Sequence, residues 1–439
     1  MKKIIISLFL ACTILSCSTD LDQEPLIQVT TENVSDIERS VFGAYLNIAN
    51  AINVEFNFGE IRSDNTTGGG EAPFSDFDLF NSFLVTSAPI QTYWDSHYFS
   101  IINCNIAINN AEGDSSEETA ELAAEAKFIR AYSYYNLVRT YGDVPINLAS
   151  TVDPDDTEVL SRKPAAQVYD QIISDLNDAI MDLPSSREES SRPTLYTAEA
   201  LLAKVYMEQG NTVAAEPLLE DVIMNSGATL LSDYADIWGE DNELNDEVLF
   251  AIQFEPNIGV ANVFVANFSL SGTDNANYGT DDLVNAYEAG DLRLDLSIDT
   301  AQSNSPKKYI PTDPEQVNDS GIDWIVIRLA DIILLYAEAL NENGSDPATV
   351  LALLDDIRTR AGLAELDPNT INTQALVLEA IKQERRVELA FENQRWYDLV
   401  RWGDAQDEVG FDNADFLVFP IPASEVNATN GSISQNDGY

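Results

Sequence analysis

The stretch with the most suggestive chemistry covers residues 56–70, with the sequence FNFGEIRSDNTTGGG. It combines aromatic rings with carboxylate, amide and guanidinium groups, and Phe74 and Phe77 follow it closely. Aromatic rings can stack on the C–H faces of neutral sugars, while polar side chains of these kinds bond the hydroxyl groups. These residue types therefore indicate a binding site for a neutral, hydroxyl-rich ligand.

The same phenylalanines allow a second interpretation. Phe77, Phe80 and Phe83 are three residues apart, which is also the pattern of one buried helical face. Both interpretations remain open at the level of sequence. Weaker binding candidates lie in a second polar segment of the chain, and they are Asn275, Asn277, Tyr278 and Tyr287.

Residues suited to nucleophilic catalysis or zinc binding are scarce. His97 is the single histidine, and Cys104 lies in an apolar helical pattern that predicts a buried thiol. The acidic run 240–247 is a calcium candidate, but it lacks the glycine of an EF-hand loop and is expected to be a solvated loop. We therefore expect no cofactor, no metal and no enzyme activity. A glycosidase with two carboxylates stays an alternative, because the acidic residues are so numerous.

The charge of the chain narrows the choice of partners. It has 439 residues, of which 74 are acidic and 23 basic, giving a formal net charge of −51. Such a field repels phosphates and anionic lipids, which excludes nucleic acid as a partner and favours neutral over polyanionic ligands. The acidity is otherwise explained by solubility outside the cell.

The N-terminus has the pattern of an export signal. Two lysines precede the apolar stretch 4–15, which is too short to span a bilayer permanently. The tetrapeptide ILSC at 14–17 resembles the bacterial lipobox, which implies removal of residues 1–16 and acylation of Cys17. Loss of both lysines takes the formal charge to −53. An ordinary signal peptide with an incidental Cys17 is the alternative.

Most of the body has the apolar spacing of amphipathic helices. One helix is expected over 118–141 and another over 164–184. In residues 200–219, small residues allow two helices to approach and Gly-Asn turns the chain, as in a tetratricopeptide hairpin. Segments 131–143 and 330–345 echo this pattern at irregular spacing. The expected fold is all-α, with irregular tetratricopeptide-like helical hairpins and loop and short-strand insertions.

The helical pattern is interrupted twice. Residues 53–93 are rich in Phe, Gly, Asn and Asp, and residues 255–325 are rich in Asn, Asp, Ser and Gly. The segments 247–254 and 324–328 have the composition of short strands. Because loops on a rigid scaffold carry binding sites, function is expected in the two interruptions.

Several motifs occur together along the chain. The C-terminal third contains RLADIILLYAEALN at 328–341, LDDIRTRAG at 354–362, IKQERRVELAFE at 381–392 and RWYDLVRWG at 395–403. The N-terminal half contains FIRAY at 128–132 and YGDVP at 141–145. Together these closely resemble the signature of the SusD/RagB family of nutrient-uptake outer-membrane lipoproteins. The acidic segment 18–25 likewise resembles the surface-export signal of Bacteroidetes lipoproteins.

The resemblance implies a non-catalytic, lipid-anchored protein on the cell surface. Family members cap a TonB-dependent, SusC-like transporter and bind glycans or, in some cases, peptides for import. It places the ligand site near an Asp-Asn pair after the first helix, here Asp64 and Asn65, with Phe74 and Phe77 as possible platforms. Three parts of the chain are expected, namely a signal peptide at 1–16, an N-terminal region at 17–225 and a C-terminal region at 226–439.

The charged residues of the C-terminal motifs are expected to be structural. They can form ion pairs in the interior or between helices. This set is Arg358, Arg360, Glu384, Arg385, Arg386, Glu388, Glu392 and Asp398. Trp94, Trp396 and Trp402 stand among apolar neighbours, which predicts core packing rather than contact with a ligand.

Overall fold

The computed structural model describes residues 35–69, 72–151, 157–186, 191–254, 262–268, 277–311, 320–429 and 431–439. Residues 35–439 form one compact unit. Cys17, the predicted signal peptide and Asn275 lie outside the described residues. The division of the body at residue 225 stays a prediction.

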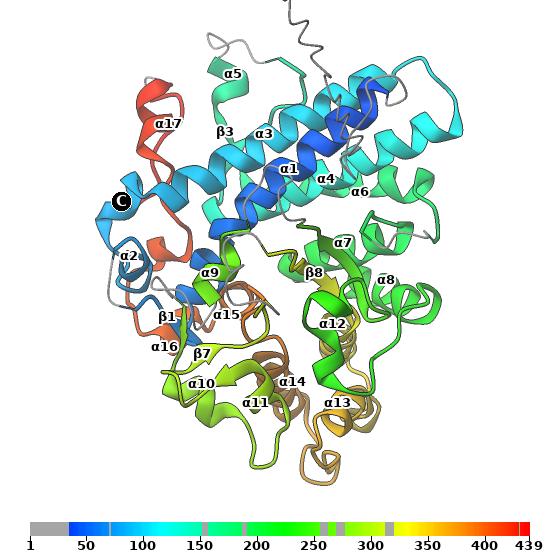
Figure 1. Ribbon diagram of the computed structural model, residues 1–439, viewed down its shortest axis with the longest axis vertical. Coiled ribbons are helices and arrows are strands. Elements are labelled where there is room, and N and C mark those ends of the chain that lie inside the picture. The colour runs from blue at the N-terminus through cyan, green and yellow to red at the C-terminus, as the bar shows by residue number, and fades with distance from the viewer. Residues whose placement is uncertain are drawn as a thin grey trace, which may run out of the picture. The chain divides into compact units, whose positions relative to one another are not determined.

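Helices make up most of the described chain (Figure 1). The longer ones are α1 (Asp36–Phe56), α3 (Ala88–Ala111), α4 (Glu117–Tyr141), α6 (Ala165–Asp182), α7 (Leu195–Glu208), α8 (Thr212–Asn225), α12 (Leu329–Glu342), α13 (Pro347–Arg360), α14 (Gln374–Glu388) and α15 (Arg395–Trp402). The short ones are α2 (Phe74–Asp78), α5 (Thr157–Leu160), α9 (Phe264–Phe268), α10 (Asp281–Ala286), α11 (Arg293–Ser297), α16 (Ala405–Val409) and α17 (Ala423–Ala428). Single turns of other helix types are η1 (Asn57–Ile61), η2 (Ser82–Thr86), η3 (Tyr234–Ile237), η4 (Glu240–Asn242) and η6 (Ala414–Leu417).

The strands are short and pair two by two in the described residues. They are β1 (Thr66–Thr67), β2 (Val144–Pro145), β3 (Arg162–Lys163), β4 (Val248–Ile252), β5 (Tyr278–Gly279), β6 (Ile298–Asp299), β7 (Ser305–Pro306) and β8 (Trp324–Arg328). The antiparallel pairs are β1–β5, β2–β3, β4–β8 and β6–β7. The all-α prediction with short-strand insertions is confirmed, and the strands predicted at 247–254 and 324–328 are β4 and its partner β8.

The predicted hairpin over 200–219 is the pair α7–α8. Gly210 adopts a φ of +68°, a conformation that L side chains rarely take, and lets the chain reverse between the helices. Asn211 then caps α8 by accepting a hydrogen bond from the Ala214 N–H at 3.4 Å. Ala203 and Ala215 are fully buried, so small side chains do line the contact between the helices. Helices α4 and α6 match the helices predicted over 118–141 and 164–184.

Helix α1 packs along α3 and also contacts α4 (Figure 1). Its side toward these helices is apolar, and Val41, Ala44, Ile48 and Ile52 are buried there. Gly43 allows close approach, because a Cβ on it would lie 2.9 Å from Asn103 Oδ1 of α3. His97 and Cys104 are both buried in α3, and burial of the Cys104 thiol was predicted from the sequence. Burial lowers the pKa of His97 to about 3 and raises that of Cys104 to about 12.

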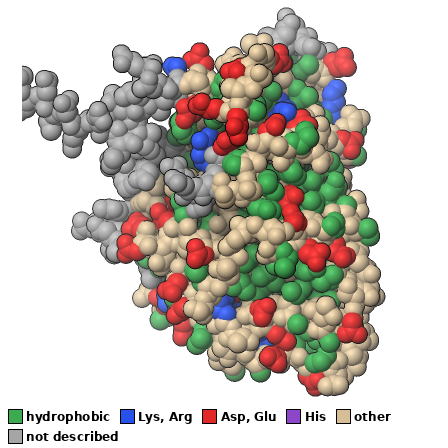
Figure 2. Space-filling view, turned by 90° about the vertical axis from the view of Figure 1, so that its right-hand side faces the viewer, with side chains coloured by type: hydrophobic (Ala, Val, Ile, Leu, Met, Phe, Trp, Pro, Cys, Tyr) green, Lys and Arg blue, Asp and Glu red, His purple; other side chains and the backbone are tan. Residues whose placement is uncertain are grey.

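The first interruption is shorter than the composition predicts. Residues 53–61 are helical, because α1 continues directly into the π-helix η1, and α3 already begins at Ala88. The segment between η1 and α3 therefore covers residues 62–87 and includes α2 and η2, and its part from 62 to 80 is named here the 62–80 loop. The face in Figure 2 carries many acidic side chains and few basic ones, in keeping with the composition. In the described residues, no helix is both long and apolar enough to cross a membrane.

Candidate ligand-binding site

The pairing of β1 with β5 joins the two predicted binding segments. Thr67 pairs with Tyr278 in this two-stranded sheet. Thr280 continues the contact, because its backbone N–H donates to the Asn65 carbonyl and its hydroxyl donates to the Asp64 carbonyl, each at 2.9 Å. Tyr278 therefore lies beside the loop that carries Asp64 and Asn65, although more than 200 residues separate them in the sequence.

Asp64 is held by two arginines. Arg395 donates two hydrogen bonds to its carboxylate, at 2.7 and 2.8 Å, and the Arg386 guanidinium lies 2.9 Å from the same group. Burial acts to raise the pKa of Asp64, but the bonds and charges of Arg395 and Arg386 outweigh it and hold the pKa below its usual range. Asp64 thus stays ionised and fixed in place.

Asn65 is buried behind this ion pair. Its side-chain oxygen accepts a hydrogen bond from Arg386 Nε at 2.8 Å, and Arg386 also bonds the exposed Asp282. The Asn65 amide nitrogen has no partner among the described residues. The side chains of the predicted Asp-Asn pair are therefore both engaged by arginines that hold the loop, with Asn65 buried and the Asp64 side chain 7% exposed.

The predicted aromatic platforms occupy different environments. Phe77 is fully buried, with its ring centroid 5.4 Å from that of Phe58 and 5.9 Å from that of Phe419. Phe74 is partly buried against Phe56. Tyr278 is also partly exposed. Of these rings, only those of Phe74 and Tyr278 are open to solvent. Tyr287, by contrast, is buried and donates its hydroxyl to the Val387 carbonyl.

The alternative of one buried helical face through Phe77, Phe80 and Phe83 is wrong. Helix α2 ends at Asp78, and Phe80 has a φ of +51°, so the chain leaves the helical path between the phenylalanines. Phe83 is 69% exposed. Sequence reasoning missed it as an accessible ring, although Asn81 offered a signal. Asn81 accepts from the Phe83 N–H and starts a new turn there, as asparagine often does.

Arg62 anchors the loop to the C-terminal segment. It is fully buried, and it donates to the carbonyls of Phe77 and Phe416 and to the Tyr439 hydroxyl, at 3.1, 3.2 and 2.7 Å. Its guanidinium also lies 3.9 Å from the ring centroid of Phe80. Burial lowers its pKa. Arg62 thus holds the loop through carbonyl groups and rings, contacts that local sequence patterns do not predict.

Asp78 closes the loop on its other side. Its carboxylate accepts hydrogen bonds from the Thr67 hydroxyl at 2.8 Å and the Gly68 N–H at 2.7 Å. Gly68 is required here, because a Cβ would lie 2.6 Å from the backbone of Phe74. Burial raises the pKa of Asp78 despite these two bonds. The loop is therefore compact and tied to α2.

Two buried glutamates lie under the site. Glu55 accepts from the Asn393 side-chain amide at 2.9 Å, and Glu60 accepts from the Asn393 backbone N–H at 2.6 Å. The i,i+5 step of η1 brings both carboxyl groups to the same residue. Burial raises the pKa of Glu55 to about 7 and that of Glu60 to about 8. Gly59 allows η1 to pack this closely against Asn393, since a Cβ at Gly59 would lie 2.0 Å from Asn393 Oδ1.

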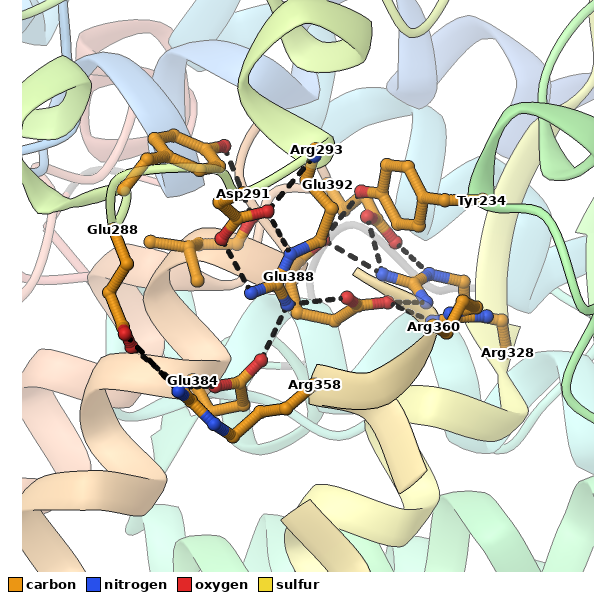
Figure 3. A network of polar contacts seen from close by, with 12 residues as sticks. Tyr234, Glu288, Asp291, Arg293, Arg328, Arg358, Arg360, Glu384, Glu388 and Glu392 are labelled. Carbon is orange, nitrogen blue, oxygen red and sulfur yellow. Dashed lines mark hydrogen bonds and ion pairs between the residues drawn. The ribbon is translucent and has the colours of Figure 1, made fainter. Parts of the chain in front are cut away.

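The C-terminal motifs form a buried ion-pair network (Figure 3). Glu388 bonds Arg293, Arg328 and Arg360 at 2.9, 2.7 and 2.5 Å. Glu384 bonds Arg293 at 2.6 Å and Arg358 at 3.2 Å, while Arg328 also reaches Glu247 and Glu392. Burial acts to raise the pKa of Glu388, and the surrounding arginines reverse this and lower it.

The ion pairs predicted from the motifs are thereby confirmed. The pairs of Arg385 with Asp331 and Asp398 and of Arg386 with Asp64 complete the predicted set. Trp94 and Trp396 are buried, also as predicted, while Trp402 is half-buried and donates its indole N–H to Glu338. In the part of the chain that the structure describes, no group of three or more His, Cys, Asp and Glu side chains could hold a metal ion.

Two family profiles match the sequence. The SusD family matches residues 274–417, and a family described as starch-binding and associating with the outer membrane matches residues 21–207. Among curated proteins, SusD-like protein P2 of Formosa agariphila is 27% identical, with 100% of both chains covered. Starch-binding protein SusD of Bacteroides thetaiotaomicron is 23% identical, with 78% of this chain and 77% of that protein covered.

Solved structures share the fold. A laminarin binding SusD-like protein is 27% identical and superposes with a TM-score of 0.80, over 93% of this chain and 100% of that one. Surface glycan-binding protein A from B. thetaiotaomicron, in complex with laminarihexaose, gives a TM-score of 0.75 at 20% identity, over 91% and 98%, which supports the fold alone. The motifs, the matched profiles and the shared helical fold show that the chain belongs to the SusD/RagB family.

Proposed function

We propose that this protein is a non-catalytic lipoprotein that captures a neutral glycan at the cell surface and delivers it to a TonB-dependent outer-membrane transporter. The observation that carries the proposal is the joining of the 62–80 loop to Tyr278 by β1 and β5. Relatives with glycan-binding names, including the starch-binding and laminarin-binding proteins, support the same role.

The described part of the loop is suited to binding because hydrogen bonds and ion pairs hold it in place before a ligand arrives. Arg62, Asp64 and Asp78 each fix a different part of it. A preformed loop loses little conformational freedom on binding. On it, Phe74 and Tyr278 keep partly exposed rings that can stack on a sugar face. Asp64 and Asn65 are then positioning residues that hold the loop and its rings.

The ligand is proposed to be neutral. The mature chain would carry a formal charge of −53, and the described Arg side chains of the site already face Asp64 and Asp282. A uronate or sulfate group would approach a strongly negative surface without a spare cation. A neutral glucan meets no such penalty.

Anchoring and delivery rest on the sequence pattern and the family. The proposal is that residues 1–16 are removed, that Cys17 carries lipid, and that the body lies outside the outer membrane. The profile over residues 21–207 is that of a family associating with the outer membrane, which supports this location.

The proposal that the protein is not an enzyme is supported by the state of the site's acids. Asp64 is ion-paired on both oxygens, and Asp78 already accepts two hydrogen bonds. Neither is set up to give or take a proton at a glycosidic bond. Sustained release of reducing sugar by the purified protein would overturn this part of the proposal.

The test is affinity electrophoresis of the mature protein without Cys17 in gels containing laminarin, starch or the anionic polysaccharide alginate. Retardation by one of the two neutral glucans, lost in Tyr278→Ala and retained in the control Tyr206→Ala on α7, is the expected result. Retardation by alginate alone would refute the neutral-ligand proposal. Absence of retardation in every gel would refute polysaccharide capture and favour short oligomers or peptides.

A further inference from the structure

The turn between α14 and α15, residues 389–394, has a costly backbone. Phe391 has a φ of +66° and Asn393 a φ of +58°, so two residues with side chains adopt the left-handed conformation close together. Asparagine tolerates this conformation, but a phenylalanine keeps it only where its surroundings hold it in place. Backbone of this kind is concentrated at functional sites, which makes the contacts of the turn informative.

The turn is fixed on two sides by carboxyl groups. Asn393 is 2% exposed, and it donates its side-chain amide to Glu55 at 2.9 Å and its backbone N–H to Glu60 at 2.6 Å. Glu392, the residue before it, bonds Arg328 and Lys308 of the buried network. The turn therefore connects the ion-pair network to the end of α1 and to η1, which lead directly into the 62–80 loop.

The same turn precedes one of the two arginines that hold Asp64. Arg395 follows Asn393 by two residues and bonds both carboxylate oxygens of Asp64, at 2.7 and 2.8 Å. Arg386 reaches the same carboxylate from α14, before the turn. When the turn opens, Asp64 therefore keeps the anchor on α14 and loses the exact placement of the other.

Contacts beyond Asp64 carry this placement to the exposed rings. The Asp64 carbonyl accepts from the Thr280 hydroxyl, and β1 pairs with β5 so that Thr67 lies opposite Tyr278. Asn393 itself touches none of the proposed ligand-binding rings in the contacts of the described residues. Any effect that it has on a ligand is thus transmitted through Arg395 and Asp64.

We propose that Asn393 is a positioning residue for ligand capture, and that it keeps the 62–80 loop in place only while the two carboxyl groups bonded to it are uncharged. The inference rests on the proposed function, which supplies the ligand. Glu60 is fully buried, and its Oε2 atom has no hydrogen-bond partner among the described residues. A negative charge there meets no donor on that oxygen, and opening of the turn relieves it by admitting water.

The charges around the two carboxyl groups agree with this geometry. Burial raises the pKa of Glu55 to about 7 and that of Glu60 to about 8, so both are largely neutral at pH 6 and largely ionised at pH 9. The charged groups that act on them are Arg139, Lys308 and Glu392. The titratable side chains that also face them, each with a pKa raised by burial and so uncharged in this range, are Tyr93, Tyr132, Tyr309 and Tyr397.

The test measures the Kd for laminarin and for soluble starch by calorimetry between pH 6 and pH 9, with the mature protein without Cys17. The wild type should bind about tenfold more weakly at pH 9, because only about one molecule in eleven then keeps Glu60 protonated. Glu60→Gln keeps an acceptor oxygen without a charge, and it should bind more tightly than the wild type at pH 9. Failure to fold cannot produce such a gain.

Matched variants separate this role from general effects of pH. The pKa of Glu199 is likewise raised to about 7, by burial and by Asp221, so Glu199→Gln on α7 is the control and should keep the wild-type decline. Asn393→Gly suits the left-handed backbone and retains the N–H, whereas Asn393→Ala strains the turn. Both lose the bond to Glu55, and the alanine variant should bind more weakly than the glycine variant at pH 6.

Hydrogen exchange tests the position of the loop without a ligand. At pH 9 the backbone amides of residues 62–67 should exchange several-fold more slowly in Glu60→Gln than in the wild type. Lys308, whose pKa burial lowers to about 8, also titrates in this range and is present in both proteins.

Equal exchange in the two proteins, or a loss of affinity with pH that persists in Glu60→Gln, would overturn the role of Asn393 and leave the proposed function standing. If neither glucan binds the wild type at any pH, capture of these glucans is refuted. Slower exchange in Glu60→Gln would still support the positioning of the loop in that case.

Discussion

Around Glu388, arginine and carboxylate side chains are buried deep in the C-terminal half, whereas residues 40–54 and 96–111 of the α1–α3 pair contain no charged residue. One region buries its charged side chains, and the other exposes apolar side chains to solvent. Each arrangement has a cost, because buried ions lose hydration and exposed apolar groups order water.

The two arrangements suit different roles. The buried network holds the fold in one geometry, whereas exposed apolar side chains are available for contact with another molecule. Replacing a buried ion pair with apolar side chains often stabilises a protein, so the network is explained less by net stability than by the single geometry that its bonds demand. Glu392 illustrates this, because it bonds Arg328 and Lys308 while its neighbour Asn393 donates hydrogen bonds to Glu55 and Glu60. The exposed side of the α1–α3 pair carries no such network, so its residues are not constrained by ion pairs and can serve contact with another molecule.

The largest effect should follow from removing one partner of the network. Arg328→Met removes the buried cation that bonds Glu247, Glu388 and Glu392 together. We expect the free energy of unfolding to fall by about 3–5 kcal/mol, measured by urea unfolding followed by circular dichroism. The exposed pair of Arg39 and Asp36 is the control, and Arg39→Met should change the free energy by less than about 1 kcal/mol. Equal changes would refute the contrast between buried and exposed charge.

Helix α1 should respond to lost volume rather than lost charge. Ile48 is fully buried in the core, so Ile48→Ala should lower the free energy of unfolding by about 2–4 kcal/mol through lost burial and a cavity. Leu46→Ala, two residues away at a side chain that is 45% exposed, should change it by less than about 0.5 kcal/mol. The same urea titration checks both variants. A large loss in Leu46→Ala would mean that the exposed side of α1 contributes to the stability of the fold.

The buried carboxyl groups of Glu55 and Glu60, which bond Asn393, should make the free energy of unfolding depend on pH. The folded-state pKa values of Glu55, about 7, and Glu60, about 8, lie above the usual 4.5, so the folded protein binds more protons than the unfolded chain from about pH 4.5 to pH 8. The free energy of unfolding should therefore fall as the pH rises, by roughly 2–3 kcal/mol between pH 6 and pH 8. Arg139, Lys308 and Glu392 are the charged groups that act on these carboxyl groups.

The variant Glu60→Gln isolates this contribution. It removes the group that titrates at the higher pH and should flatten the dependence of the urea midpoint on pH. The depressed pKa values of Asp64 and Glu388 act in the opposite sense, and their stabilisation is lost only as the solution becomes acidic. An unchanged slope in Glu60→Gln would place the pH-sensitive groups elsewhere.

The smallest effect should come from salt. The surface acids repel one another, and salt screens exposed charges while leaving the buried network largely unaffected. Raising NaCl from about 0.02 M to about 0.5 M should increase the free energy of unfolding by about 1 kcal/mol, seen as a higher melting temperature. Arg328→Met should show the same increment as the wild type. A much larger increment in that variant would mean that the network itself is exposed to screening.

Local patterns in the sequence were sufficient for the framework. The apolar period predicts α4, α6 and the α7–α8 hairpin, because each buries one face on a neighbour close by in the chain. Composition likewise predicts β4 and β8. The charged motifs also indicate their own role as ion pairs, since so many arginines and glutamates on apolar helices must find each other.

The site was harder to predict because its contacts are remote and its backbone is irregular. Nothing near Asp64 in the sequence indicates that Arg395 will hold it, and nothing near Phe77 indicates Phe58 and Phe419 as its neighbours. The positive φ of Phe80 takes the chain out of the helical path, so Phe77 is buried while Phe83 is exposed, and apolar periodicity does not predict such a turn. The sequence thus indicated the loop and its residue types, but not which aromatic rings are buried or exposed, because that depends on tertiary packing.

The bond between Asp64 and Arg395 spans 331 positions of the chain. The loop near the N-terminus therefore cannot take its final form until almost the whole polypeptide has emerged and the segment after α14 has been laid against it. A fragment that stops short of Arg395 keeps every residue of the 62–80 loop and still lacks the guanidinium that orders it. Under the proposed function, a complete chain is thus a condition for ligand capture, and unfinished chains would not compete with whole ones for glycan.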